Sequence, residues 1–359
     1  MKAYYLVFVL TLLLSVVLQA RTDKQWRWKL FFTFLPLFIF GAIRVDFGND
    51  YSSYEAIYES VHSMGIFRFD TDAHAEIGYQ LLNRIMPSFR LLLILSAFLL
   101  SLSVSVFCYN NVPNKYLWLF VLLMFLNPEK NVYGTLVAMR SGLCVSAFLL
   151  CFVFIQKRKL IPFALVTVAL TFIHTSAAIF LPLAYIVGYN KPFTKIEIWV
   201  WGTVVATMLI LSQSQFFDII NLMISNDVLE RYEDVLAAST LHRGLLAVVS
   251  NVIFIVMLLW YLTTRGNDLK PGETSVMRVG ILYALFFLMG SLAMRASYFY
   301  NLVFIAAVVR VYSDRKANPE LRYGLVALVL LSSYYSMYHI WMGADWWDHA
   351  VYHSLFGNW

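Results

Sequence analysis

Four ionisable residues border or interrupt long apolar runs, where charge is costly. They are Arg44, Arg140, His174 and Arg295. A charged side chain at the centre of a membrane helix costs about 2.5–3.5 kcal/mol on insertion scales, so each needs a local reason to persist. Guanidiniums match phosphate oxygens in bidentate geometry. Three guanidiniums and an imidazole facing one cavity would repel each other without an anion, which predicts a phosphate or pyrophosphate ligand.

Each of these residues also has a structural interpretation. An arginine near the end of a helix can extend its head group to the membrane surface while its stem stays in the apolar layer. A single histidine in an apolar turn is more often a hydrogen-bonded structural residue than a catalyst. The similar depth that the topology below gives to all four residues favours the shared anion site.

The segment after Arg44 interleaves carboxylates with tyrosines. Its members are Asp46, Asp50, Tyr51, Tyr54, Glu76 and Tyr79. Aromatic rings stack on sugar faces and carboxylates accept hydrogen bonds from hydroxyls, so this composition suits sugar binding. A carboxylate can also take the proton of an attacking hydroxyl. The structural alternatives are that Asp50 caps a helix starting at Tyr51 and that Glu76 favours the first turn of the next helix.

The rest of the chain must hold these residues in a membrane. Of its 359 residues, 60% are hydrophobic and 13% are charged, far more apolar than a soluble core requires. Runs at 4–20, 91–108 and 245–262 approach the length of about 20 residues that crosses a bilayer as a helix. The composition predicts an all-α, multi-pass membrane protein forming a single domain over 1–359. The net charge of +6 is explained by basic loops between spans, so nucleic-acid binding is not indicated.

Basic clusters at 21–29, 157–159, 265–278 and 310–322 mark the cytoplasmic side by the positive-inside rule. Only one apolar stretch, 160–189, separates two cytoplasmic loops, so it must fold back at the polar break 172–176. Its arms of about 14 residues, roughly 21 Å of helix, are too short for full spans. The sequence therefore predicts a re-entrant-like hairpin with His174 at its tip.

The resulting topology has about 11–12 membrane segments and two long outer loops, 44–90 and 213–242. The predicted spans are 4–20, 29–43, 90–108, 115–127, 132–155, the arms 160–173 and 176–188, then 196–212, 243–263, 276–293, 298–312 and 323–342. This scheme places the four ionisable residues near the outer boundary. The sequence suggests no metal cluster, no nucleotide-binding loop and no cofactor.

Several short motifs occur in an order that resembles the EpsG family, which is related to the Wzy polymerases. They are Arg44 followed by Gly-x-Asp-Tyr-x-x-Tyr at 48–54, Glu76-x-Gly-Tyr79, Met-Arg-Ser-Gly-Leu at 139–143, Phe-Ile-His-Thr-Ser-Ala at 172–177, and Arg295 with Tyr298 and Phe299. The chain departs from the usual family pattern at Ser141, where glutamine is common, and at Thr175, where a basic residue is common.

The resemblance implies a GT-C-like membrane glycosyltransferase at the outer face of the bacterial inner membrane. It would join undecaprenyl-diphosphate-linked oligosaccharides, as both donor and acceptor, into O-antigen, capsule or exopolysaccharide. A chain-length regulator of the same pathway would be a partner. Arg140 and Arg295 would neutralise the departing pyrophosphate with help from Arg44, and Tyr298 would lie near the substrate. The base would be His174 or one of the carboxylates, chiefly Glu76 or Asp50.

Three other functions stay open at this point. An O-antigen ligase uses the same donor with another acceptor and also needs outward-facing arginines. A transporter or flippase of lipid-linked sugars predicts polar residues through the full membrane thickness and inverted repeats. A structural envelope protein leaves the arginines within apolar segments unexplained.

Overall fold

The computed structural model describes residues 2–48, 50–65, 68–70, 75–127, 131–213, 245–288, 291–342, 353–355 and 357–358. Nearly all of this part of the chain is helical. It packs as two compact units, one formed by Met1–Ile186 with Val329–Trp359 and the other by Val187–Leu328. The prediction of one membrane domain over the whole chain stays a prediction.

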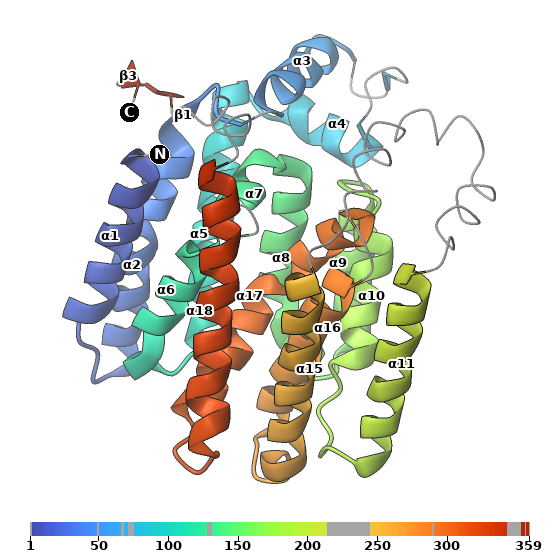
Figure 1. The fold of residues 1–359 in the computed structure, drawn as a ribbon. Coiled ribbons are helices and arrows are strands. Elements are labelled where there is room, and N and C mark those ends of the chain that lie inside the picture. The colour runs from blue at the N-terminus through green and yellow to red at the C-terminus, as the bar shows by residue number, and fades with distance from the viewer. Residues whose placement is uncertain are drawn as a thin grey trace. The chain divides into compact units, whose positions relative to one another are not determined.

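The first unit is built on long helices that pack side by side (Figure 1). They are α1 (Lys2–Val17), α2 (Asp23–Ile43), α5 (Phe89–Asn111), α6 (Leu117–Phe125) and α8 (Met139–Gln156). Helix α2 packs against both α1 and α5, and α5 packs against α8. Local signals start two of these helices, because the hydroxyls of Thr22 and Ser88 accept hydrogen bonds from the backbone N–H groups of Gln25 and Leu91.

Two shorter helices, α3 (Tyr51–His62) and α4 (Ile77–Ile85), lie at the end of the first unit where α2 ends and α5 begins (Figure 1). The same region carries a small antiparallel sheet in the order β1–β2–β3. Its strands are β1 (Arg44–Val45), β2 (His353–Ser354) and β3 (Gly357–Asn358). The helical prediction is confirmed for the described part of the chain, apart from this sheet, which the sequence did not predict.

The break in the apolar stretch 160–189 is present as predicted. Helix α9 (Leu160–Thr171) and helix α10 (Ala177–Val187) are joined through the turn that contains His174. The ring of Phe163 near the start of α9 stacks on the ring of Tyr185 near the end of α10, with 5.2 Å between centroids. The two helices therefore run antiparallel as a hairpin, while its placement in a membrane stays a prediction.

One predicted span is not a continuous helix. The sequence indicated a single helix over 132–155, whereas the structure has α7 (Val132–Val137) and α8 with a break at Ala138, whose ψ of 71° is not helical. At Gly142 an added Cβ would collide with the carbonyl oxygen of Thr135. This close approach of the two short backbone segments is available only to glycine.

The second unit contains α11 (Lys195–Gln213), α15 (Leu245–Arg265), α16 (Pro271–Leu288), α17 (Ser291–Ser313) and the first part of α18 (Pro319–Met342). Helix α16 packs against α15, α17 and α11. The guanidinium of Arg278, fully buried in α16, donates to both carboxylate oxygens of Glu197 on α11 at 2.9 and 3.0 Å. An arginine that the sequence placed in a basic loop is thus a buried link between two helices.

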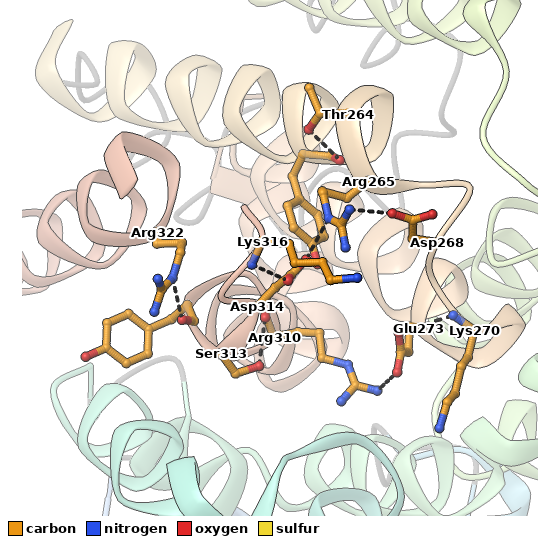
Figure 2. A network of polar contacts seen from close by, with 12 residues as sticks. Thr264, Arg265, Asp268, Lys270, Glu273, Arg310, Ser313, Asp314, Lys316 and Arg322 are labelled. Carbon is orange, nitrogen blue, oxygen red and sulfur yellow. Dashed lines mark hydrogen bonds and ion pairs between the residues drawn. The ribbon is translucent and has the colours of Figure 1, made fainter. Parts of the chain in front are cut away.

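Ion pairs connect the helix ends of the second unit (Figure 2). Arg265 at the end of α15 contacts Asp314 after α17 at 3.0 Å, and it also pairs with Asp268. Arg310 on α17 pairs with Glu273 in the first turn of α16. These contacts fix the connections between α15, α16 and α17.

Four helical segments in the described part of the chain are long and apolar enough to cross a membrane. They are Asp23–Ile43, Phe89–Asn111, Met139–Gln156 and Val248–Arg265. Five shorter apolar helices accompany them: Ala3–Val17, Asn114–Phe125, Leu160–Thr171, Ala177–Val187 and Ser297–Ser313. Together they describe a multi-pass membrane protein. The full count of 11–12 segments stays a prediction, and the outer loop 213–242 lies almost entirely outside the described residues.

Candidate active site

The side chain of Glu76 lies between Arg140 and His174. Its Oε2 atom accepts a hydrogen bond from Nη1 of Arg140 at 2.7 Å, and its Oε1 atom lies 3.0 Å from Nδ1 of His174. The backbone N–H of Thr175 also donates to Oε1, at 3.1 Å. All three side chains are half-buried. Residues from α4, α8 and the α9–α10 turn therefore form one polar cluster.

A backbone contact holds Glu76 in this position. The N–H groups of Gly78 and Tyr79, in the first turn of α4, donate to the carbonyl oxygen of Phe172 at 2.8 and 3.2 Å. An added Cβ on Gly78 would lie 2.6 Å from that oxygen. The start of α4 thus docks on the end of α9, where free carbonyls complement free N–H groups. Glu76, the residue before α4, consequently reaches the hairpin turn.

Two tyrosine rings flank the guanidinium of Arg140. Its central carbon lies 5.9 Å from the ring centroid of Tyr54 and 6.0 Å from that of Tyr79, within cation–π range. The two rings contact each other edge to face at 5.8 Å. Both tyrosines are buried in a cluster that also contains Phe89 and Leu143. The structure places these predicted sugar-binding rings against Arg140.

Charge and hydrogen bonding keep Glu76 ionised. Burial by itself would raise the pKa of this carboxyl, but the hydrogen bond with His174 and the charge of Arg140 outweigh burial and lower the pKa to about 2. An ionised carboxylate only accepts hydrogen bonds, so Nδ1 of His174 is the donor in this contact. Among the described residues no hydrogen-bond partner contacts Nε2 of His174.

Arg44 occupies a structural position at the end of α2. It is fully buried, and its guanidinium donates to the carbonyl of Gly41 at 2.6 Å and to the hydroxyl of Ser96 on α5 at 3.0 Å. These contacts tie α2 to α5. The sequence analysis grouped Arg44 with the phosphate ligands because Arg44 and Arg140 are both arginines at a similar predicted depth. Residue type and predicted depth do not indicate a hydrogen-bond partner on another helix.

The remaining predicted residues have varied positions. Asp46 and Asp50 are exposed, and Asp50 occupies the N-cap position of α3 without a capping hydrogen bond from its side chain. Tyr51 is half-buried, with its ring 5.3 Å from that of Phe89. In the second unit, Tyr298 on α17 is half-buried, and the side chain of Arg295 lies outside the described residues. The roles predicted for these residues stay predictions.

Two groups in the cluster were not predicted from the sequence. The N–H of Thr175 completes the coordination of Glu76, and Gly78 permits the docking on Phe172. The glycine in Glu-x-Gly-Tyr was a usable signal, because a glycine in the first turn of a short helix indicates a close backbone approach. The backbone N–H of Thr175 could not be predicted in this way, because residue type does not indicate what a main-chain donor binds.

These features define a class of protein: a multi-pass helical membrane protein with a half-buried carboxylate, imidazole and guanidinium at the end of its helices. The chain matches the model of the EpsG family over residues 27–354 and belongs to that family, which consists of Wzy-type polymerases. It is therefore a membrane protein of the polysaccharide repeat-unit polymerase type. Comparisons with curated proteins and with solved structures gave no match.

Proposed function

We propose that this protein joins undecaprenyl-diphosphate-linked oligosaccharide repeats into a polysaccharide at the outer face of the bacterial inner membrane. Membership of the EpsG family supports the general reaction. The observation that carries the assignment to particular residues is the contact of Glu76 with both His174 and Arg140. This arrangement supplies a proton acceptor beside a cation, and transfer from a diphosphate donor requires both.

In the proposed reaction a hydroxyl of the incoming repeat attacks the anomeric carbon of the growing chain. The bond from that carbon to the lipid diphosphate breaks as the new glycosidic bond forms, and the hydroxyl proton passes to Nε2 of His174. Glu76 receives the hydrogen bond from Nδ1 and stabilises the imidazolium that results. General base catalysis of this kind contributes about 10²–10⁴-fold. Asp46, Asp50 and the half-buried Tyr51 would bind the sugars, while the buried rings of Tyr54 and Tyr79 would hold Arg140 in position.

The leaving undecaprenyl diphosphate carries the negative charge, and fixed cations near it lower the barrier. We assign this role to Arg140 and Arg295, with Tyr298 beside the substrate. Arg140 has a second role, because its charge adds to the hydrogen bond from His174 in keeping the pKa of Glu76 low, and the ionised carboxylate fixes which imidazole nitrogen carries the proton. Arg44 would assist from its buried position by holding α2 and α5 together.

The test is polymerisation in vitro with purified lipid-linked repeat, comparing wild type with His174→Ala, Glu76→Gln and Asp50→Asn. We expect His174→Ala to lose at least about 100-fold in rate while substrate binding persists. An unchanged rate in His174→Ala would remove the histidine from the mechanism. Loss in Asp50→Asn alone, with substrate still bound, would move the proton acceptor to that carboxylate.

A deletion strain separates this function from its rivals. A polymerase deletion leaves single repeats on undecaprenyl diphosphate or on their final acceptor and removes long chains. A ligase deletion would leave long chains on undecaprenyl diphosphate. A flippase deletion would leave single repeats on the cytoplasmic side.

A further inference from the structure

An apolar groove runs between α2 and α5 within the first compact unit. Its volume is about 580 Å³, and its walls include Phe31, Phe34 and Phe38 of α2 with Phe98 and Leu102 of α5. Along α2 the lining extends over residues 27–38, which at 1.5 Å per residue is about 17 Å. Half of a hydrocarbon core is about 15 Å thick. The groove therefore has the length of one membrane leaflet.

Two small residues on α5 create the space. Ser101 and Ser105 lie one helical turn apart among the lining residues, facing the phenylalanines of α2. The hydroxyl of Ser105 donates to the carbonyl of Ser101 at 2.7 Å. The hydroxyl of Ser105 is therefore hydrogen-bonded to the backbone of its own helix. A groove with large apolar walls and such a hollow suits a flexible hydrocarbon chain.

The groove has one cationic end. Nη2 of Arg27 lies 3.2 Å from Oδ2 of Asp23 and 3.3 Å from the hydroxyl of Tyr109, and that hydroxyl donates to Oδ1 of Asp23 at 2.6 Å. These contacts hold the guanidinium in place and occupy only one of its nitrogens. No hydrogen bond joins its Nε or Nη1 to the part of the chain that the structure describes, and its central carbon lies 5.2 Å from the centroid of the Tyr109 ring. The side chain of Arg27 is 69% exposed, so these donors are open to a ligand.

The surrounding charge favours an anion. Arg21 and Lys24 are also exposed where α2 begins, so the Asp23 carboxylate does not neutralise this rim. Guanidinium groups bind phosphate with two parallel hydrogen bonds. Basic residues at the end of membrane helices attract anionic lipids.

We propose that the groove binds an acyl chain of an anionic glycerophospholipid, with the lipid phosphate at Arg27. The position argues against the lipid tail of the sugar substrate. Glu76, His174 and Arg140 belong to the region where α2 ends at Ile43, whereas Arg27 lies near the other end of the same helix. A lipid that placed its diphosphate at the candidate active site would not place a phosphate at Arg27. By the positive-inside rule the bound lipid belongs to the cytoplasmic leaflet.

The experiment uses the full-length protein in phosphatidylethanolamine vesicles that contain a trace of phosphatidylglycerol with a photoactivatable acyl chain. Cross-linked peptides are mapped by mass spectrometry. We expect label in peptides covering 27–38 and 98–110 to exceed label on the other apolar helices. Arg27→Gln should lower that ratio by about fivefold or more, because it removes the phosphate ligand. Lys159→Gln, which removes an exposed charge from a different basic cluster, should leave the ratio unchanged.

A second variant tests the hollow itself. Ser105→Phe should fill the groove and remove the selective label while Arg27 stays in place. Even labelling of all apolar helices, or an unchanged ratio in Arg27→Gln, would overturn the proposal. Equal labelling by photoactivatable phosphatidylethanolamine would overturn the requirement for an anionic head group. Displacement by added undecaprenyl phosphate would overturn the phospholipid in favour of a polyprenyl lipid.

Discussion

Glu76 is the residue on which the candidate site depends, because one carboxylate contacts a cation, an imidazole and a main-chain N–H. The sequence singled out Glu76, Arg140 and His174 individually. It treated the arginine and the histidine as a group of like-charged ligands and the glutamate as part of a separate sugar site. Their direct contact was not predictable, because the partners are 64 and 98 residues apart and only the docking of α4 brings them together.

At this scale we expect Arg140→Ala to reduce polymerisation by about 100-fold or more without loss of folded protein, because it removes a cation from the leaving diphosphate. Arg140→Lys should restore activity only in part, since an ammonium lacks the bidentate geometry. Polymer length on gels and yield on size exclusion measure the two quantities. Arg68→Ala, at an exposed position between α3 and α4, is the control and should behave as wild type. Full-length polymer from Arg140→Ala would disprove the assignment.

The lowered pKa of Glu76 predicts how the stability of the folded protein depends on pH. Because its pKa is lowered from 4.5 to about 2 in the folded protein, its ionised form stabilises the fold above about pH 4.5. That contribution is lost as pH falls through 2. The midpoint of thermal unfolding of wild type should therefore exceed that of Glu76→Gln by a constant amount from pH 7 to 5, and by less at pH 3. A difference that is the same at pH 7 and pH 3 would contradict the role of the ionised carboxylate.

Among the elements, the hairpin of α9 and α10 was predictable and the break before α8 was not. Topology required the stretch 160–189 to turn back, and its polar residues at 172–176 fixed the place. The segment 132–155 contains no proline and reads as one apolar helix. Its interruption at Ala138 comes with the packing of Gly142 on Thr135, which neighbouring residues do not reveal.

The docking of α4 on α9 can be tested by adding one methyl group at Gly78. Gly78→Ala would place its Cβ 2.6 Å from the carbonyl oxygen of Phe172, so α4 must shift and carry Glu76 away from His174. We expect this variant to lose most polymerisation activity. Gly65→Ala is a matched control in the same segment, since no atom lies within 4 Å of the added Cβ. Normal activity in Gly78→Ala would show that the contact does not position Glu76.

For the whole molecule, composition was sufficient to predict a multi-pass helical membrane protein, because apolar residues exceed the needs of a soluble core. The division into two compact units was not predicted. It has no linker of distinctive composition, and its boundaries fall at the end of α10 and within α18. The role predicted for Arg295 stays a prediction, because the pattern of charges along the sequence indicates depth in the membrane and not the direction of a side chain.

The orientation in the membrane is testable on the whole protein. In a background without Cys108, Cys144 and Cys151, we expect Thr175→Cys to react with an impermeant maleimide added to intact cells. Lys270→Cys should react only after the membrane is opened, because its loop belongs to a basic cluster. Labelling of Lys270→Cys from outside would reverse the topology and move the proposed reaction to the other face.

The separation of 98 residues between Glu76 and His174 has a consequence for biosynthesis. A ribosome adds about 5–20 residues per second, so the glutamate leaves the ribosome about 5–20 s before the histidine does. During that interval α4 has no hairpin to dock on, and Glu76 lacks the partner that His174 provides. The candidate cluster of Glu76, Arg140 and His174 therefore assembles only after the α9–α10 hairpin has been synthesised. A nascent chain arrested before residue 172 would carry the residues between α2 and α5 that we propose to bind substrate, but it would lack the histidine that we propose as proton acceptor.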